Sequence, residues 1–229
     1  MRVFWAHAAD SPSIPDAQFI HGLLAPQRQH LVSSRKSLMT DSQTSSKPVL
    51  REKGRILSAS EIERTLVRLA HEIIEKNNGA ENLGLVGVQR RGVPLAKRLA
   101  ALINGIEKHT VDVGVLDISF YRDDLTTKDV RPVLNPGDLG FDVNGRNVVL
   151  VDDVLYTGRT VRAALDALFD HGRPRRVQLL TLIDRGHREL PIEATFVGRT
   201  VQTSSREIIE VKLREVDNDE QVLIVERVD

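Results

Sequence analysis

From about residue 56 onward, hydrophobic and polar residues follow two alternating patterns along the chain. Aliphatic residues between 62 and 73 recur at the spacing of one helix face. A Ser-Ala-Ser-Glu sequence typical of a helix start precedes them, and an Asn-Asn-Gly sequence typical of a helix end follows. Short aliphatic runs and alternating segments elsewhere are typical of strands. The expected helices cover about 58–77, 94–103 and 160–170, and the expected strands cover 83–88, 111–119, 147–151, 176–183, 195–201, 207–213 and 222–225.

Strands that alternate with helices predict an α/β fold, in which a mainly parallel sheet is covered by helices on both faces. The late strands are expected to add a small antiparallel hood. Residues 123–145 contain several prolines and glycines and follow neither pattern. We therefore expect a long loop there, and a long loop in a compact domain usually serves function.

The first fifty residues differ from the rest of the chain. They are rich in Ser, Pro, Gln and His without a sustained period, which predicts disorder. We therefore expect an N-terminal extension over 1–50 and one domain over 51–229. The extension has five basic residues, three acidic residues and many hydroxyls, so it also fits a targeting peptide. Translation from Met39 is a further alternative.

Charge and composition exclude several classes of protein. The chain has 32 basic and 32 acidic residues, and residues 51–229 alone have 27 and 29. This balance argues against indiscriminate nucleic-acid binding but leaves room for a local basic patch. The sequence has no cysteine, which excludes disulfides, thiolate zinc sites and cysteine nucleophiles and makes a reducing compartment the default. No apolar run approaches the roughly 18 residues that span a membrane.

The most informative stretch runs from Val148 to Thr160. An apolar strand ends in two adjacent carboxylates, Asp152 and Asp153, and α/β sheets bind ligands at this end of their strands. A Thr-Gly-Arg-Thr turn then opens a helix, where backbone N–H groups, hydroxyls and a glycine suit a phosphate. Because like charges repel, the carboxylates suit sugar hydroxyls or a metal held through water. The stretch predicts a ribose 5-phosphate site, and a strand-turn-helix with an acidic cap is the structural alternative.

This stretch resembles the phosphoribosyl pyrophosphate (PRPP) motif of type I phosphoribosyltransferases. The region from about 56 to 226 further resembles the family of bifunctional pyrimidine operon regulators and uracil phosphoribosyltransferases. The most specific segments are Tyr121–Leu125 (YRDDL) and Asp184–Pro191 (DRGHRELP), and Ala70–Glu72 and Arg91–Gly92 support them. The first fifty residues lie outside the resemblance.

The resemblance implies roles for individual residues. Asp152 and Asp153 would bind the ribose hydroxyls, and the turn from Gln89 to Gly92 would hold the pyrophosphate. Arg122 would neutralise the leaving pyrophosphate from a loop that closes over the site and excludes water. The candidate catalytic residues are thus Asp152, Asp153 and Arg122. The candidate substrate-binding residues are Arg90, Arg91, Asp152, Asp153, Val154, Leu155, Tyr156, Thr157, Gly158, Arg159, Thr160, Asp184 and Arg185.

Several of these residues have a structural alternative. Arg90, which stands where the family often has threonine, fits a solvated turn together with Arg91. Asp184 and Arg185, which would lie in the hood over the base, also fit a surface ion pair. The polar face of the first helix fits an ordinary solvated surface. The resemblance implies instead that basic residues on this helix and in the hood bind RNA, namely Arg68, His71, Lys76, Arg185 and Arg188.

The resemblance implies two functions for one molecule. The first is transfer of the phosphoribosyl group from PRPP to uracil, giving UMP and diphosphate, with Mg²⁺ carried by PRPP and no direct protein ligand. The second is binding of the pyrimidine operon leader messenger RNA when UMP or UTP is bound, which regulates transcription by attenuation. It also implies a cytoplasmic homodimer or larger homo-oligomer without a membrane partner. A phosphoribosyltransferase for a purine base, without RNA binding, is the alternative.

Overall fold

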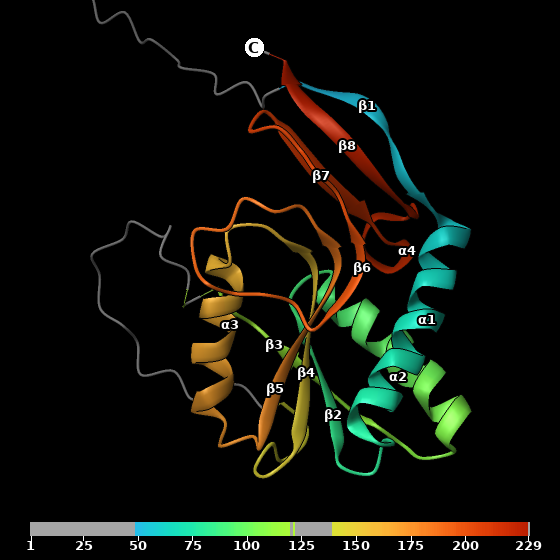
Figure 1. Cartoon of the computed structure of the whole chain (residues 1–229), viewed down its shortest axis with the longest axis vertical. Helices are drawn as coiled ribbons and strands as arrows, with labels where there is room; N and C mark the ends of the chain where they lie inside the picture. The colour runs from blue at the N-terminus through green and yellow to red at the C-terminus, as the bar shows by residue number, and fades with distance from the viewer. Residues whose placement is uncertain (1–48, 120, 122–138, 229) are drawn as a thin grey trace, which may run out of the picture. The chain divides into compact units, whose positions relative to one another are not determined.

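The computed structural model describes residues 49–119, 121 and 139–228. Within them, five strands form a parallel sheet in the order β3-β2-β4-β5-β6, and three form an antiparallel sheet in the order β1-β8-β7 (Figure 1). This confirms the predicted fold class. The elements are β1 (Val49–Ser58), α1 (Ala59–Asn77), β2 (Leu83–Val88), α2 (Gly92–Glu107), β3 (Asp112–Leu116), β4 (Asn147–Leu155), α3 (Arg159–Asp170), β5 (Arg176–Asp184), β6 (Phe196–Thr200), β7 (Glu207–Lys212), α4 (Arg214–Asp217) and β8 (Gln221–Val228).

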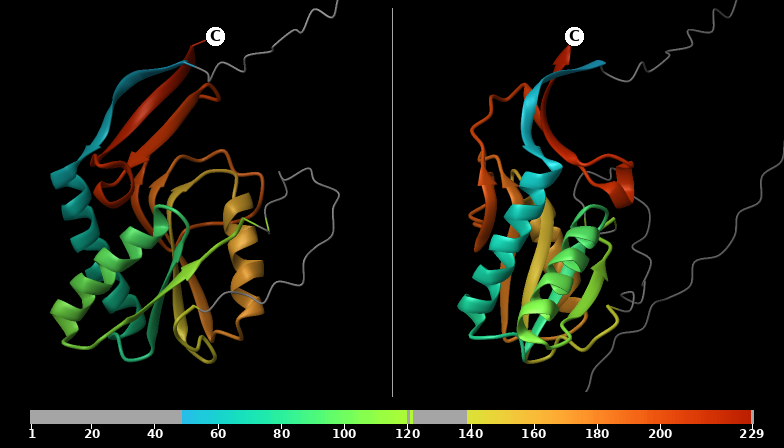
Figure 2. Two further views of the ribbon diagram at one scale, coloured as in Figure 1. Left: turned by 180° about the vertical axis from the view of Figure 1, so that it is seen from behind. Right: turned by 90° about the vertical axis from the view of Figure 1, so that its right-hand side faces the viewer.

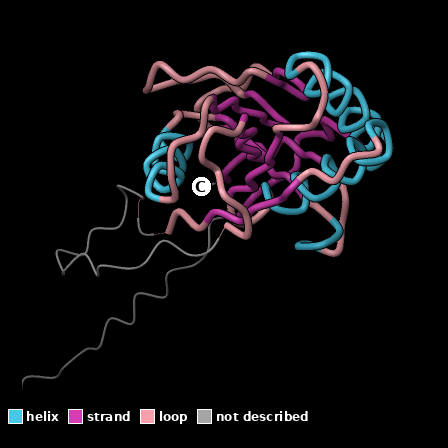
Figure 3. Tube along the Cα trace, turned by 90° about the horizontal axis from the view of Figure 1, so that it is seen from below, coloured by secondary structure: helices cyan, strands magenta, loops and turns pink. Residues whose placement is uncertain are grey.

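Helices cover both faces of the parallel sheet. Figures 2 and 3 show α1 and α2 on one face and α3 on the other. Successive side chains of β4 therefore enter different cores. Val149 and Val151 pack in the cluster that contains α1 and α2 residues, whereas Val148 and Leu150 pack in the cluster that contains α3 residues. Burial on both faces explains why this strand is continuously apolar.

The ends of α1 follow from local sequence. The Ser58 backbone N–H and hydroxyl both donate to Glu61 Oε2, at 2.8 and 2.7 Å. The helix ends at Asn78, which has a left-handed conformation with φ of 56° that asparagine tolerates better than most residues. Between them, the predicted aliphatic stripe is buried. The predicted helix and both of its end signals are confirmed.

Several elements differ from the sequence-based prediction. The strand predicted at 195–201 is β6, which extends the parallel sheet instead of joining the hood. The hood, as we call the antiparallel sheet together with α4, gains its third strand from β1, which pairs with β8. Neither β1 nor α4 was predicted, because four of the ten residues of β1 are charged and α4 has only four residues. The helix α2 and the strand β4 each extend four residues beyond their predicted ends.

Two predictions fall wholly or partly outside the described residues. The predicted extension over 1–50 overlaps them only at Val49 and Leu50, which begin β1. The predicted loop at 123–145 overlaps them only from 139 onward, where the chain forms neither helix nor strand. Among the described helices, none is long and apolar enough to cross a membrane.

Candidate active site

The parallel sheet places two adjacent carboxylates at the carboxyl end of its central strand, β4. Asp152 is buried and Asp153 is half-buried, and the Asp153 backbone N–H donates to Asp152 Oδ1 at 3.0 Å. Burial raises the pKa of Asp152, and the negative charge of Asp153 raises it further. Burial also raises the pKa of Asp153, although the positive charge of Arg91 opposes this. A phosphate beside this pair would add repulsion, whereas sugar hydroxyls can donate hydrogen bonds to it.

The turn between β4 and α3 has the geometry of an anion site. Gly158 lies at the N-cap of α3 with φ of +92°, a left-handed conformation that glycine adopts without strain. A Cβ at this position would lie 3.3 Å from Leu190 Cβ, so the turn also packs closely against a following loop. The first N–H groups of a helix lack partners within the helix and favour an anion there. The predicted phosphate turn therefore directly follows the two carboxylates in space as well as in sequence.

The loop between β5 and β6 holds this turn in place. Thr157 O accepts hydrogen bonds from the backbone N–H groups of Glu189 and Leu190, at 2.9 and 3.1 Å. Arg159, a predicted phosphate-binding residue, pairs with Glu189 at 2.7 Å. Both side chains of this pair are at least half exposed, so the pair contributes little to stability. A bound phosphate can therefore replace Glu189 at low cost.

Arg188 joins the same loop to the phosphate turn from inside. Its Nη2 atom pairs with Asp184 at 2.6 Å, and only 22% of its side chain is exposed. Asp184 also accepts a hydrogen bond from the Gly186 backbone N–H at 3.0 Å. The alternative of an ion pair between Asp184 and Arg185 is wrong, because Asp184 pairs with Arg188 instead. The guanidinium of Arg188 donates in addition to four backbone carbonyl oxygens, those of Leu155, Tyr156, Gly186 and Ile192.

Arg185 is buried and connects the site to the hood. It is 6% exposed, and its Nη2 atom donates to Glu207 O at 2.8 Å. Its Nε atom donates to Thr203 Oγ1 at 3.2 Å. The guanidinium also lies 4.0 Å from the ring centroid of the exposed Tyr156, a favourable cation–π contact. Arg185 thus supports the Tyr156 ring and the hood, while its contacts with nucleotide or RNA stay predictions.

The predicted pyrophosphate turn, 89–92, lies directly against β4. A Cβ at Gly92 would lie 2.2 Å from Val151 O, and one at Gly87 would lie 2.5 Å from Val93 Cα. Only glycine allows such close approach of backbone to backbone. The Gln89 backbone N–H donates to Leu116 O at 2.9 Å, and the peptide bond that follows Gln89 is cis. The turn is therefore fixed beside the residue that precedes Asp152.

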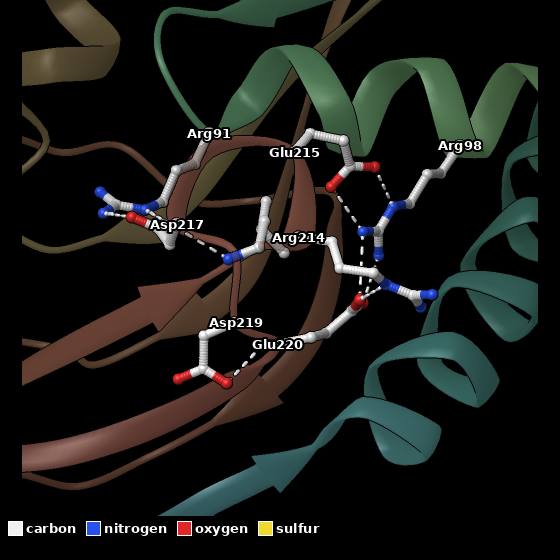
Figure 4. A network of polar contacts seen from close by, with 8 residues as sticks. Arg91, Arg98, Arg214, Glu215, Asp217, Asp219 and Glu220 are labelled. Atoms are coloured by element: carbon white, nitrogen blue, oxygen red, sulfur yellow. Dashed lines mark hydrogen bonds and ion pairs between the residues drawn. The ribbon is translucent and has the colours of Figure 1, made fainter.

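The two arginines of this turn have different surroundings. Arg90 is exposed. Arg91 is partly buried, and its Nε and Nη2 atoms donate to the two carboxylate oxygens of Asp217 in α4, at 3.0 and 2.7 Å (Figure 4). This bond raises the pKa of Arg91 and lowers that of Asp217. Asp217 was not predicted as a site residue, because nothing in the pattern around α4 indicates a partner far away in the chain.

The predicted closing loop is only partly described. Tyr121, the first residue of the YRDDL segment, donates through its hydroxyl to Asp170 Oδ2 at 2.6 Å, and Asp170 is the last residue of α3. This bond and burial raise the pKa of Tyr121. The candidate catalytic residue Arg122 lies outside the described residues.

The residues predicted to bind RNA do not share one environment. Arg68, His71 and Lys76 are exposed on α1. Arg68 pairs with Glu72, and its Nη2 atom donates to the β6 carbonyl oxygens of Val197 (3.1 Å) and Gly198 (2.7 Å). Arg185 and Arg188 instead turn their guanidinium groups toward the interior. Three of the five predicted residues are therefore exposed on one helix, and two shape the loop beside the site.

The donor set of the site bears on the predicted magnesium. Among residues 49–119, 121 and 139–228, no three or more His, Cys, Asp or Glu side chains are grouped as metal ligands. The two carboxylates at the end of β4 suit a cation that keeps its own water and is shared with a substrate. Mg²⁺ behaves in this way, because it dehydrates reluctantly and is often bound through one or two carboxylates and substrate phosphates. The residues present therefore fit magnesium that arrives with a phosphorylated substrate.

Comparison with known proteins places the chain in a family. Residues 53–225 match the phosphoribosyl transferase domain family. The bifunctional protein PyrR of Pelotomaculum thermopropionicum is 61% identical over 77% of this chain and 97% of its own length. The PyrR of Thermus thermophilus is 55% identical over 78% of this chain and 98% of its own length.

Solved structures agree with this assignment at the level of the fold. The hypoxanthine phosphoribosyltransferase of Trypanosoma cruzi superposes with a TM-score of 0.59 at 17% identity, covering 77% of this chain and 98% of that one. That of Staphylococcus aureus superposes with a TM-score of 0.56 at 21% identity, covering 75% and 92%. Identities this low show a shared fold alone. Taken with the close sequence relatives, they show that the chain belongs to the phosphoribosyltransferase family and, within it, to the bifunctional PyrR proteins.

Proposed function

We propose that this protein transfers the phosphoribosyl group of PRPP to uracil, forming UMP and diphosphate, and that it regulates the pyrimidine operon by uridine-nucleotide-dependent binding to leader messenger RNA. One observation carries the catalytic part. The buried Asp152 and the half-buried Asp153 lie between a glycine-opened helix N-terminus and the turn that contains Arg91. This order of groups matches a ribose with a phosphate on one side and a pyrophosphate on the other.

The proposed reaction needs positioning more than acid–base chemistry. A uracil nitrogen attacks the anomeric carbon as diphosphate leaves, so positive charge develops on the sugar ring. Asp152 and Asp153 hold the ribose hydroxyls and place negative charge beside that ring. Residues 156–160 hold the 5-phosphate while Arg91 holds the pyrophosphate, which fixes the reacting carbon between them. Arg122 remains a proposed contact for the leaving group.

Magnesium belongs to this proposal as part of the substrate. When bound to the pyrophosphate of PRPP, it supplies positive charge that offsets the phosphate charges. Asp152 and Asp153 are the residues that would hold it, through its water shell. Burial raises the pKa of both residues, and the charge of Asp153 further raises that of Asp152. A nearby cation would therefore favour their ionised forms.

The catalytic proposal is tested with purified protein, PRPP, Mg²⁺ and labelled uracil. We expect UMP and diphosphate in equal amounts, and no UMP when PRPP is left out. Failure to form UMP with all three components present would defeat the enzyme proposal. Resemblance to hypoxanthine phosphoribosyltransferases extends to the fold alone, so a purine substrate has weaker support.

The regulatory proposal concerns the exposed basic face of α1. Arg68, His71 and Lys76 would contact the leader RNA, in part through salt-dependent phosphate contacts. Unpaired bases in an RNA loop would supply the sequence specificity. We further propose that the protein is cytoplasmic, where such transcripts occur, and that it forms a homodimer or larger homo-oligomer.

A gel shift with the native leader RNA, with and without UMP, tests the regulatory role. We expect UMP to strengthen binding and a scrambled RNA to bind more weakly. Equal affinity for both RNAs would remove the regulatory claim. Light scattering on the same sample gives the oligomeric state, and a monomer would contradict the proposed assembly.

A further inference from the structure

The guanidinium of Arg91 is bound along only one of its edges. A guanidinium has five N–H groups, and Asp217 accepts from Nε and from one N–H of Nη2. Within the described residues, no hydrogen bond joins Nη1 to an acceptor. The Nη1 edge of the fork therefore remains for a second anion. Arginine forks bind carboxylates and phosphates in this two-point manner.

Asp217 is itself held firmly in the hood. Its Oδ2 atom accepts from the Leu213 backbone N–H at 2.9 Å, and its own backbone N–H donates to Leu213 O at 2.7 Å. Only 18% of its side chain is exposed. A carboxylate fixed to its own backbone in this way presents both oxygens in one orientation. It can therefore set the orientation of Arg91.

A second arginine fixes α4 against α2, as Figure 4 shows. Arg98 donates through Nε (2.8 Å) and Nη2 (2.6 Å) to the two oxygens of Glu215, and it also pairs with Glu220. Glu220 pairs in addition with Arg214 at 2.5 Å. These partners raise the pKa of Arg98. The short helix that contributes Asp217 is thus tied to α2, the same helix that begins directly after Arg91.

Arg91 also interacts electrostatically with Asp153, one of the two carboxylates proposed to bind the ribose. The negative charge of Asp153 raises the pKa of Arg91, and the charge of Arg91 partly offsets the burial that raises the pKa of Asp153. Gly92, the residue after Arg91, packs against the backbone of Val151 and Asp152. The guanidinium thus lies within electrostatic reach of Asp153 while Asp217 binds its Nε edge. This is the place where the pyrophosphate of PRPP would leave the ribose.

We propose that Asp217 is a positioning residue for pyrophosphate: it binds the Nε edge of Arg91 and holds the Nη1 edge ready for the leaving group. The inference rests on the proposed phosphoribosyl transfer and adds a hood residue to that site. The competing hypothesis is that Asp217 occupies Arg91 in place of pyrophosphate and opposes its binding. The free Nη1 edge favours positioning, because both anions can bind the fork together.

The test compares two ligands of the full-length protein by calorimetry. Magnesium pyrophosphate needs Arg91, whereas UMP fills the ribose-phosphate and base sites without it. For Asp217→Asn we expect pyrophosphate affinity to fall about tenfold, the order of effect of one charged hydrogen bond, and UMP affinity to change less than about twofold. Because Asn can still cap its own turn but lacks the charge, the loss should be specific to Arg91.

The matched control is Asp219→Asn in the same turn. Asp219 accepts hydrogen bonds from Glu220 N and the Gln221 side chain, both at 2.8 Å, and its ion pair is with Lys212 instead of Arg91. Both affinities should stay at the wild-type value in this variant. In an Arg91→Ala background, Asp217→Asn should cause no further loss of pyrophosphate affinity.

Three outcomes would overturn the inference. Tighter pyrophosphate binding by Asp217→Asn would show that Asp217 competes with the ligand. Equal losses of UMP and pyrophosphate affinity would make its role merely structural, and a further tenfold loss in the Arg91→Ala background would show that it acts elsewhere. Failure of the proposed function is distinguishable, because wild-type protein would then bind neither UMP nor magnesium pyrophosphate.

Discussion

Two glycines of α2 should respond in opposite ways to the same substitution. A Cβ at Gly92 would lie 2.2 Å from Val151 O, 3.2 Å from Val151 C and 3.4 Å from Asp152 Cα. A Cβ at Gly105 would have no atom within 4 Å. Replacing either glycine by alanine favours the helix by about 0.5 to 1 kcal/mol. Only Gly92→Ala therefore meets a steric cost.

The cost at Gly92 is set by backbone atoms that cannot rotate away. Relieving a 2.2 Å contact moves the start of α2 or the end of β4 by about 1 Å, and overpacking of this kind costs roughly 1 to 3 kcal/mol. After the gain in helix stability is subtracted, we expect Gly92→Ala to lower the free energy of unfolding by about 1 to 2 kcal/mol, or the Tm by roughly 3 to 6 °C. Transferase activity should fall up to about 100-fold, because the pyrophosphate turn and Asp152 move apart.

Thermal unfolding and initial rates of UMP formation measure both effects. Gly105→Ala should raise Tm by about 2 °C and keep wild-type activity. Equal stability and equal rates in Gly92→Ala and Gly105→Ala would contradict this prediction. Loss of activity in Gly105→Ala would contradict it as well, because the effect would then not depend on contact with β4.

Three further substitutions test other contacts. Asp153→Asn should lower the rate of UMP formation at least about 100-fold. Its Tm should not fall, because the substitution removes a charge whose burial is unfavourable. A normal rate would contradict the ribose-binding role. Glu207 has its pKa lowered from 4.5 to about 2, chiefly by its hydrogen bond with Lys53, so its contribution to stability is present above pH 4.5 and is lost toward pH 2. In urea unfolding, the stability difference between wild type and Glu207→Gln should therefore shrink over that range, and a constant difference would be inconsistent with the pair. Arg188→Lys keeps the positive charge but loses the planar guanidinium, and it should lower the free energy of unfolding by about 2 kcal/mol. Arg206→Lys, at an exposed position, should lower it by less than about 0.5 kcal/mol. Similar values for both variants would argue against the interior role of Arg188.

The parts of the fold that the sequence predicted are those encoded over short distances. The start of α1 rests on Ser58 and Glu61, three residues apart, and its end rests on Asn78. Strand β1 has no such local signal. Its charged residues become a strand only by pairing with β8, with Arg51 opposite Glu226 at the other end of the chain.

The distance in sequence between interacting residues also explains which site residues were predicted. Asp152, Asp153 and Gly158 belong to one strand-turn-helix, so their spacing in sequence already places them together. Asp217 reaches the site only through Arg91, 126 residues earlier, and a short acidic helix gives no pattern from which to infer that contact.

Residue type alone also did not predict the direction in which an arginine side chain points. Arg185 and Arg188 are basic like the exposed residues of α1, yet their donors bind backbone carbonyl oxygens of the hood and the phosphate turn. Which way an arginine points depends on unpaired acceptors nearby, and those appear only once the loops are folded. Their predicted contacts with RNA therefore need a direct test.

The proposed reaction at this site joins uracil to a phosphoribosyl group. The most direct measurement supplies purified protein with PRPP, Mg²⁺ and equal concentrations of labelled uracil, guanine and hypoxanthine in one reaction, and then separates the nucleotides formed. UMP as the dominant product is the predicted result. GMP or IMP as the dominant product would contradict the account.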